Sequence, residues 1–140
     1  MRVIPEIMKF QSDRGLDKKP FDAINENVNI LEELFEAHGY DIPKEQRDNL
    51  KFAWLDMVNN FAGKVDDGES PIVDAYCDVI VFAVGAIMKL GYAPEIALQE
   101  AGKEINSRVG GMVNGKFEKD LSPEAQANWY KADYSKAIKL

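Results

Sequence analysis

The chain has 140 residues, a length that fits one domain, which we take to span residues 1–140. Hydrophobic residues make up 46% of it and charged residues 29%, a balance typical of globular proteins and not of disordered ones. The formal net charge of −7 argues against nonspecific binding to nucleic acid, which needs a positive surface.

The first residues and the cysteine content bear on the compartment. The segment MRVIPEIMKF lacks the apolar core of a signal peptide, and no segment reaches the roughly 20 apolar residues of a membrane span. The single cysteine, Cys77, lies in an apolar segment, which indicates a buried thiol in a reducing compartment. We therefore expect a cytoplasmic protein with no membrane partner.

Apolar residues at three- and four-residue steps predict helices along the first half of the chain. A short helix is expected over 4–14 and ends at Gly15. A second is expected from residue 21 until Gly39 stops it. Pro43 opens a third, which runs to residue 61.

The second half begins with a helix over 72–90, which Ser70 and Pro71 introduce and Gly91 closes. A fifth helix is expected over 94–108. The stretch GGMVNGKFEKD reads either as a tight hairpin or as a mobile loop. Ser122 caps a last helix, which is expected to contain Trp129, Tyr130 and Tyr134.

These elements define the expected fold class. Period-two alternation is almost absent, so the class is all-α. Helices joined by short loops are typical of a bundle of antiparallel neighbours. The helix over 72–90 has apolar residues around nearly its whole circumference, and we expect it to be buried.

Two aspartates interrupt this apolar helix. Asp74 and Asp78 are four residues apart and share one ridge, which Gly85 continues. Two carboxylates together on a buried helix are costly unless something compensates them, and a hard divalent cation would do so. The alternative is that the ridge is a solvated face, or that Asp74 is a helix-start acid stabilised by the helix dipole.

A second acidic cluster lies on the helix that begins near residue 21. Glu32, Glu33 and Glu36 are spaced by one, three and four residues, so all three occupy one arc of the helix. Carboxylates at such spacing can bind Mg²⁺ while waters and phosphate oxygens complete the octahedron. Taken alone, this string is usually just a solvated helix face. The joint occurrence of both clusters favours a metal.

Other metal or nucleotide motifs do not fit the sequence. A di-iron bundle needs Glu-x-x-His, whereas the one histidine, His38, follows Glu36 by two residues and reads as a helix-end residue. The DDGES loop lacks the ligand spacing of an EF-hand, and there is no Walker pattern.

The string E-E-x-x-E, followed by an acidic pair on a later apolar helix, resembles the MazG-like, all-α nucleoside triphosphate pyrophosphatase superfamily. Dimeric dUTPases and phosphoribosyl-ATP pyrophosphohydrolases belong to the same group. The resemblance covers roughly residues 21–116. It implies a four-helix-bundle core with extra N- and C-terminal helices. It also implies Mg²⁺-dependent cleavage of the α–β phosphate bond of a nucleotide, with Mn²⁺ as a substitute metal.

The resemblance also assigns roles by position. Glu33, Glu36 and Asp78 match the metal ligands, and Glu32 matches an acid near the attacking water. The second motif departs from the commonest form, Glu-x-x-Asp, because its other acid is Asp74, four residues before Asp78. A branch with a D-A-x-x-D string and a later N-x-S-K/R is similar in both places, since Asn106, Ser107 and Arg108 follow.

Basic and amide side chains near the end of the fifth helix are candidate phosphate contacts. Lys103 and Asn106 are three residues apart and could reach one ligand, with Arg108 less directly placed. Lys116, in a stretch containing several glycines, could close over a substrate. The alternative is that all four are ordinary surface residues.

Two further expectations concern assembly and function. The apolar 72–90 helix needs more cover than one thin domain gives, which predicts a homodimer or homotetramer. The competing functional class is a noncatalytic helical protein whose acidic face binds a basic partner, but that class does not explain Asp74 and Asp78. A phosphoribosyl-ATP-type hydrolase would use the same metal chemistry with another pocket.

Overall fold

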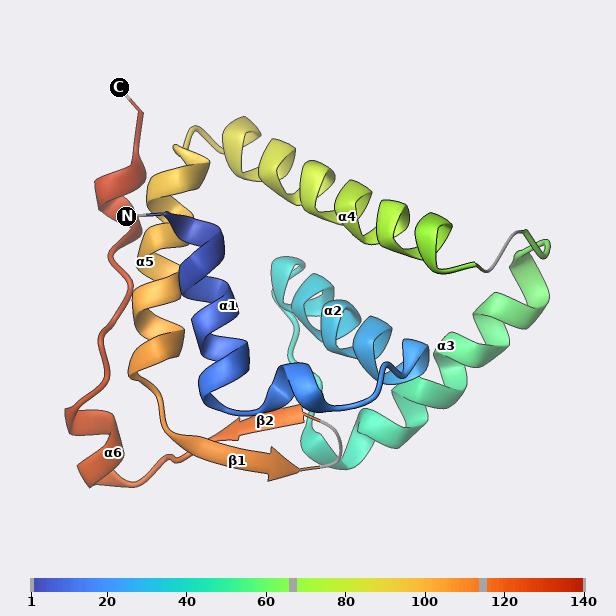
Figure 1. Cartoon of the computed structure of the whole chain (residues 1–140), viewed down its shortest axis with the longest axis horizontal. Helices are drawn as coiled ribbons and strands as arrows, with labels where there is room; N and C mark the ends of the chain where they lie inside the picture. The colour runs from blue at the N-terminus through green and yellow to red at the C-terminus, as the bar shows by residue number, and fades with distance from the viewer. Residues whose placement is uncertain (1, 66–67, 114–115, 140) are drawn as a thin grey trace. The chain divides into compact units, whose positions relative to one another are not determined.

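A computed structural model describes residues 2–65, 68–113 and 116–139. These residues form six α-helices, three short 3-10 helices and one two-stranded hairpin (Figure 1). The expectation of a mostly helical chain is thereby confirmed. The contacts divide the chain into two units, one of Met1–Lys19, Asp66–Gly111 and Lys119–Leu140, the other of Pro20–Val65 and Met112–Glu118.

The first unit is organised around the pair of helices α1 (Val3–Asp13) and α5 (Pro94–Ser107), which lie side by side (Figure 1). Gly102 faces α1, where an added Cβ would lie 3.7 Å from the Cβ of Glu6, an ordinary contact distance. Arg14, just beyond α1, donates to the carbonyl oxygens of Ile105 (3.1 Å) and Arg108 (2.5 Å). The guanidinium therefore binds carbonyl oxygens at the C-terminal end of α5, where the Ile105 carbonyl also accepts from the Arg108 amide at 3.3 Å.

The remaining helices of this unit are α4 and α6. Helix α4 spans Glu69–Lys89, and α6 is short, Pro123–Ala127, with the Ser122 side chain accepting from the Ala125 amide at 3.2 Å.

The glycines that the sequence places at helix ends behave as expected. Gly15, Gly39 and Gly91 have φ of 67°, 86° and 87°, a region that other residues enter only with strain.

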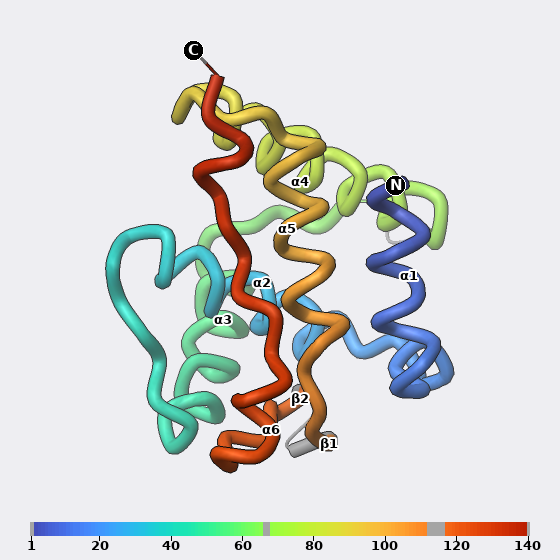
Figure 2. The backbone as a smooth tube through the Cα atoms, turned by 90° about the vertical axis from the view of Figure 1, so that its left-hand side faces the viewer, coloured from blue at the N-terminus to red at the C-terminus, as the bar shows by residue number. Residues whose placement is uncertain are grey.

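The last helix differs from the sequence prediction, because α6 ends at Ala127 instead of continuing through Trp129, Tyr130 and Tyr134. Residues 128–139 form an extended strap that runs antiparallel along α5 and includes the 3-10 helix η3 (Tyr134–Ala137) (Figure 2). The strap amides donate to side chains of α5 in place of helical carbonyls: Tyr130 to Ser107 Oγ at 2.8 Å, and Asp133 to Glu100 at 3.0 Å. Its far end pairs with the turn before α5, where the Ala93 amide donates to the Ala137 carbonyl at 2.7 Å.

The second unit contains α2 (Ala23–Ala37) and α3 (Arg47–Phe61), with the 3-10 helix η2 (Lys44–Gln46) leading into α3. Asp22 caps α2 by accepting from the amides of Ile24 (3.0 Å) and Asn25 (3.3 Å). His38 is the residue after the last turn of α2, as the sequence predicts. Val28 is fully buried on this helix.

The glycine-containing stretch forms the hairpin, one of the two alternatives that the sequence allows. Strand β1 spans Gly110–Val113 and β2 spans Lys116–Lys119 (Figure 1). The amide of Asp120 donates to the carbonyl of Val109 at 2.6 Å just beyond the two strands. Glu118 on β2 forms an ion pair with Lys44 of η2 at 3.0 Å.

Helix α4 differs most from expectation, because none of its 21 residues, all of them described, is buried. Phe82 is 77% exposed, and the expected buried thiol of Cys77 is exposed as well. Ile80 and Val84 line an apolar hollow of about 610 Å³ together with residues of α1 and α5, so α4 touches its own unit loosely. The prediction of a buried helix is therefore wrong for the single chain, because the described residues of its own unit do not cover α4 closely.

The length and composition of α4 also bear on the membrane expectation. Among the described residues, α4 alone is long and apolar enough to cross a membrane by these two criteria, in contrast to the expectation that no segment is. The core helix of a soluble protein meets the same criteria. Asp74 and Asp78 lie within it, and ionised carboxylates are costly in a bilayer.

Candidate functional site

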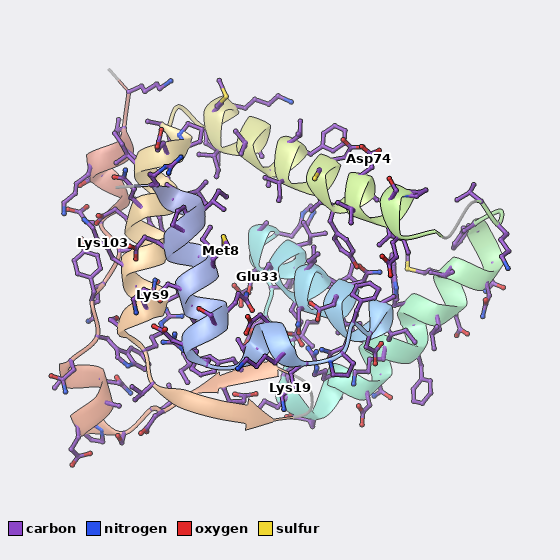
Figure 3. The ribbon with its side chains drawn as sticks, viewed as in Figure 1. Met8, Lys9, Lys19, Glu33, Asp74 and Lys103 are labelled. Atoms are coloured by element: carbon purple, nitrogen blue, oxygen red, sulfur yellow. The ribbon has the colours of Figure 1, made fainter. Side chains whose placement is uncertain are left out.

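The three clustered glutamates of α2, Glu32, Glu33 and Glu36, divide into one buried and two exposed side chains. Glu32 is 8% exposed, whereas Glu33 and Glu36 lie on the exposed surface of the helix. Figure 3 labels Glu33 on α2. The exposed pair, three residues apart, therefore remains accessible from solvent in the single chain.

The buried Glu32 has a specific partner on α3. Its Oε1 lies 2.7 Å from Nη1 of Arg47, whose side chain is almost fully buried. The Nη2 of Arg47 donates to the side-chain oxygens of Asn25 (2.9 Å) and Asn29 (2.7 Å). One guanidinium thus joins three side chains of α2 to the first turn of α3, which gives Glu32 a structural role.

The two aspartates on α4 are both exposed. Asp74 and Asp78 lie one turn apart on the same helix, and Figure 3 labels Asp74 there. Their carboxylates need no compensating group in the single chain, because water solvates them. Burial would therefore require a compensating metal only in a state in which α4 is covered.

The acidic clusters belong to different units, α2 to one and α4 to the other. Within the part of the chain that the structure describes, no three Asp, Glu, His or Cys side chains are grouped closely enough to hold a metal ion. The exposed carboxylates of the two clusters fit Mg²⁺, which prefers hard oxygen ligands, and α4 also carries the exposed thiol of Cys77 between its two aspartates. Each pair supplies half of the expected ligand set.

The candidate phosphate contacts on α5 have internal partners. Lys103 Nζ lies 3.1 Å from Glu100 Oε2 and 5.6 Å from the centre of the Tyr130 ring. Arg108 pairs with Glu104 at 3.0 Å and lies 5.5 Å from the centre of a Trp129 ring. Each cation therefore has one carboxylate from its own helix and one aromatic ring from the strap.

Asn106 has partners away from the strap. Its Nδ2 donates to the carbonyl oxygens of Glu6 on α1 and Gly102, both at 3.0 Å. Lys103, three residues earlier, contacts Glu100 and the strap, so in the single chain the two side chains do not reach toward a common point. The side chain of Lys116 lies outside the described residues, so its expected role stays a prediction.

Two features of the structure were not expected from the sequence. Arg47 was not singled out, although the spacing of Asn25, Asn29 and Glu32 marks a polar stripe on α2 that indicates a buried polar partner. Glu100 was also missed. It accepts hydrogen bonds from the Tyr130 hydroxyl, the Asp133 amide and Lys103.

These contacts lower the pKa of Glu100 to about 2, the Tyr130 hydrogen bond being the largest cause, although burial opposes the shift. The Glu100 carboxylate is therefore charged throughout the neutral range and needs its cationic neighbours.

Comparisons with protein-family models, with curated proteins and with solved structures each find no match to this chain. The established class is thus a mostly helical protein with one small hairpin.

Proposed function

We propose that the chain is a Mg²⁺-dependent nucleotide pyrophosphohydrolase. It cleaves the α–β phosphate bond of a nucleoside triphosphate and releases the monophosphate and pyrophosphate. The observation that carries the proposal is the pair of exposed aspartates, Asp74 and Asp78, on a helix that is otherwise apolar for most of its length. Lysines at these two positions would keep the helix soluble equally well, so solubility does not account for an acidic ridge. Carboxylates, in contrast to lysines, suit a hard cation.

In this proposal, Glu33 and Glu36 from α2 and Asp74 and Asp78 from α4 hold the metal. Bound Mg²⁺ would neutralise the triphosphate and lower the pKa of an attacking water, which an acidic protein of net charge −7 requires before it binds a polyanion. Lys103, Asn106, Arg108 and Lys116 would contact phosphate oxygens. For Lys103 and Arg108, this contact requires an exchange of their present carboxylate partners.

The proton acceptor stays a prediction at Glu32. In the single chain this carboxylate holds Arg47, a contact that competes with proton transfer from water. Replacement of Glu32 by Gln separates the two roles. A proton acceptor lost from the site lowers kcat without changing the unfolding midpoint, whereas a lost ion pair lowers the midpoint.

We further propose that α4 is covered by a second copy of the chain in a cytoplasmic homodimer or homotetramer, which completes a four-helix-bundle core. The exposed apolar side chains of α4 support this assembly, because monomers rarely expose contiguous apolar patches larger than a few hundred Å². Protein cover suits α4 better than lipid, because it can accommodate Asp74 and Asp78 at the edge of the contact.

The decisive experiment is release of pyrophosphate from a panel of canonical and deoxynucleoside triphosphates, with and without Mg²⁺. Asp78→Asn and Glu36→Gln are expected to lower kcat at least 100-fold. Matched controls are Asp56→Asn on α3 and Glu26→Gln on α2, both exposed acids outside the clusters. If the wild type releases no pyrophosphate from any substrate, including phosphoribosyl-ATP, the noncatalytic class is favoured. If the variants match the wild type, the metal ligands are wrongly assigned.

A further inference from the structure

A buried carboxylate on α5 has two lysine partners. Glu100 is 2% exposed. Its Oε2 lies 3.1 Å from Nζ of Lys103 on the same helix, and its Oε1 lies 3.5 Å from Nζ of Lys136 in η3 of the strap. Oε1 also accepts from the Tyr130 hydroxyl and from the Asp133 amide. One buried negative charge thus has two ammonium groups within ion-pair distance, one on each oxygen.

The two lysines differ from the other partners of Glu100 because they can leave it. The Lys103 and Lys136 side chains are 40% and 52% exposed, and their long stems can swing toward solvent. The hydroxyl of Tyr130 and the amide of Asp133 are fixed by the path of the strap. If both lysines left, Glu100 would keep two neutral donors and no cation, an arrangement that is costly for a buried charge.

Neighbouring charges do not replace the lysines. One turn further along α5, Glu104 pairs with Arg108 at 3.0 Å, so this cation has its own carboxylate. Asp133 faces its own 3-10 helix, where its side chain accepts from the Ser135 amide at 3.1 Å. Neutralisation of Glu100 therefore depends on Lys103 and Lys136 alone within the described residues.

A change in protonation does not alter the charge balance around Glu100 at neutral pH. The pKa of Glu100 is lowered to about 2, and the pKa of Lys136 is raised, mainly by its hydrogen bond with the Tyr130 hydroxyl and by the charge of Glu100. Both groups stay charged at neutral pH, so the charge balance can change only when a side chain moves.

We propose that Lys136 is a reserve counter-ion, which keeps Glu100 neutralised when Lys103 leaves it to bind a phosphate-bearing anion. This inference rests on the proposed function, which gives Lys103 its phosphate contact. Lys136 is then a positioning residue, because it acts on the ligand through the availability of Lys103 and does not touch the ligand. The strap gains a function from this arrangement, since it places Lys136 near Oε1 of Glu100, whereas Lys103 contacts Oε2.

The first test needs no ligand. Lys103→Gln and Lys136→Gln are each expected to lower the melting temperature by about 2 °C, because one lysine replaces the other. The double variant is expected to lose roughly 5 °C more than the sum, because it strips Glu100 of its last cation. In the control cycle, Lys139→Gln takes the place of Lys136→Gln, because Lys139 is also an exposed lysine of the strap. Its effect on the melting temperature is expected to add to that of Lys103→Gln without any further loss. Additive losses for Lys103 and Lys136 would overturn the proposal.

The second test titrates the full-length protein with inorganic triphosphate in the presence of Mg²⁺, followed by calorimetry. The Lys136→Gln variant is expected to bind triphosphate five- to tenfold more weakly than the wild type. In the pyrophosphate-release assay, the same variant is expected to raise KM for the nucleotide without changing kcat. In a Glu100→Gln background the same substitution should have no effect, because no buried charge then retains Lys103. If the loss persists in that background, Lys136 contacts the anion directly and the proposal is wrong.

The outcomes separate this proposal from the proposed function. Pyrophosphate release by the wild type together with an unaffected Lys136→Gln variant overturns the reserve counter-ion alone. A wild type that neither binds triphosphate nor releases pyrophosphate overturns both. If Glu100→Gln does not fold, the ligand-free cycle of Lys103 and Lys136 decides.

Discussion

Arg47 on α3 joins α2 to α3 through buried polar contacts. It is 5% exposed and holds Glu32, Asn25 and Asn29 through two nitrogens. A buried ion pair of this kind stabilises little relative to an apolar pair of the same volume, but removal of one member is expensive. Removal of one member of the pair should therefore cost far more stability than replacement of both members by apolar residues, and a comparison of single and double variants measures this difference.

Arg47→Ala is expected to lower the free energy of unfolding by about 3 kcal/mol, because it leaves Glu32 buried without its guanidinium. Urea unfolding followed by the fluorescence of Trp54, on the same helix, measures this loss. The double variant Glu32→Leu/Arg47→Met should recover most of it. The control is Lys51→Met, whose exposed ion pair with Asp48 spans 4.0 Å and should be worth less than about 0.5 kcal/mol. Equal losses in the two single variants would contradict the prediction.

Glu100 makes the stability of the strap depend on pH in the acid range. Its pKa in the folded chain is about 2, below the ordinary value of 4.5, chiefly because Tyr130 donates to it. A lowered pKa contributes stability that is complete above about pH 4.5 and is lost as the pH falls toward 2. We expect the carboxyl carbon of Glu100 to titrate near pH 2 by NMR. A midpoint near 4.5 would show that the strap does not hold this carboxylate in solution.

At the level of elements, the sequence predicted those parts whose determinants are local. Glycines at positive φ and capping side chains fix the ends of α1, α2 and α4, and the spacing of apolar residues locates α5. The strap was not predicted, because its conformation depends on distant partners: Trp129 and Tyr130 follow a good helix start, yet their partners lie on α5. Propensity favours helix there, and tertiary contacts override it.

The candidate site was predictable to a similar extent. Helical spacing places Glu33 with Glu36 and Asp74 with Asp78 from sequence alone. The burial of Glu32 could not be read from the E-E-x-x-E string alone, because Glu32 and Glu33 differ by one position; the stripe that Glu32 forms with Asn25 and Asn29, and its partner Arg47 on α3, distinguish them. The apolar composition of α4 predicted burial, whereas the helix is exposed in the single chain, because composition alone does not show which surface covers a helix.

Helix α4 leads to a prediction about self-association. Phe82→Glu should weaken it at least tenfold, because the glutamate would have to be desolvated where the phenyl group is covered. Sedimentation velocity over a range of protein concentrations measures the change. Phe61→Glu, at the end of α3 and 84% exposed, is the matched control and should leave the assembly intact. A wild type that stays monomeric at all concentrations would contradict the assembly proposed for α4.

For the whole molecule, the proposed metal links ligand binding to stability. At a Mg²⁺ concentration about 100 times the dissociation constant, binding should add about 2.7 kcal/mol to the free energy of unfolding. A rise of several degrees in melting temperature is expected for the wild type and for Glu26→Gln, and no rise for Glu36→Gln or Asp78→Asn. The same rise in all four proteins would indicate nonspecific screening of the acidic surface. No rise in any of them would argue against the metal.

The exposed thiol of Cys77 provides a position at which the covering of α4 can be measured. It is the one cysteine in the sequence, and it lies on α4 between Asp74 and Asp78. A single chain therefore offers one reactive thiol per molecule to a labelling reagent, whereas a chain whose α4 is occupied should react slowly. The rate of modification then counts free α4 helices directly, and a fluorophore attached there would sense from one position both the covering of the helix and the arrival of a cation at its carboxylates.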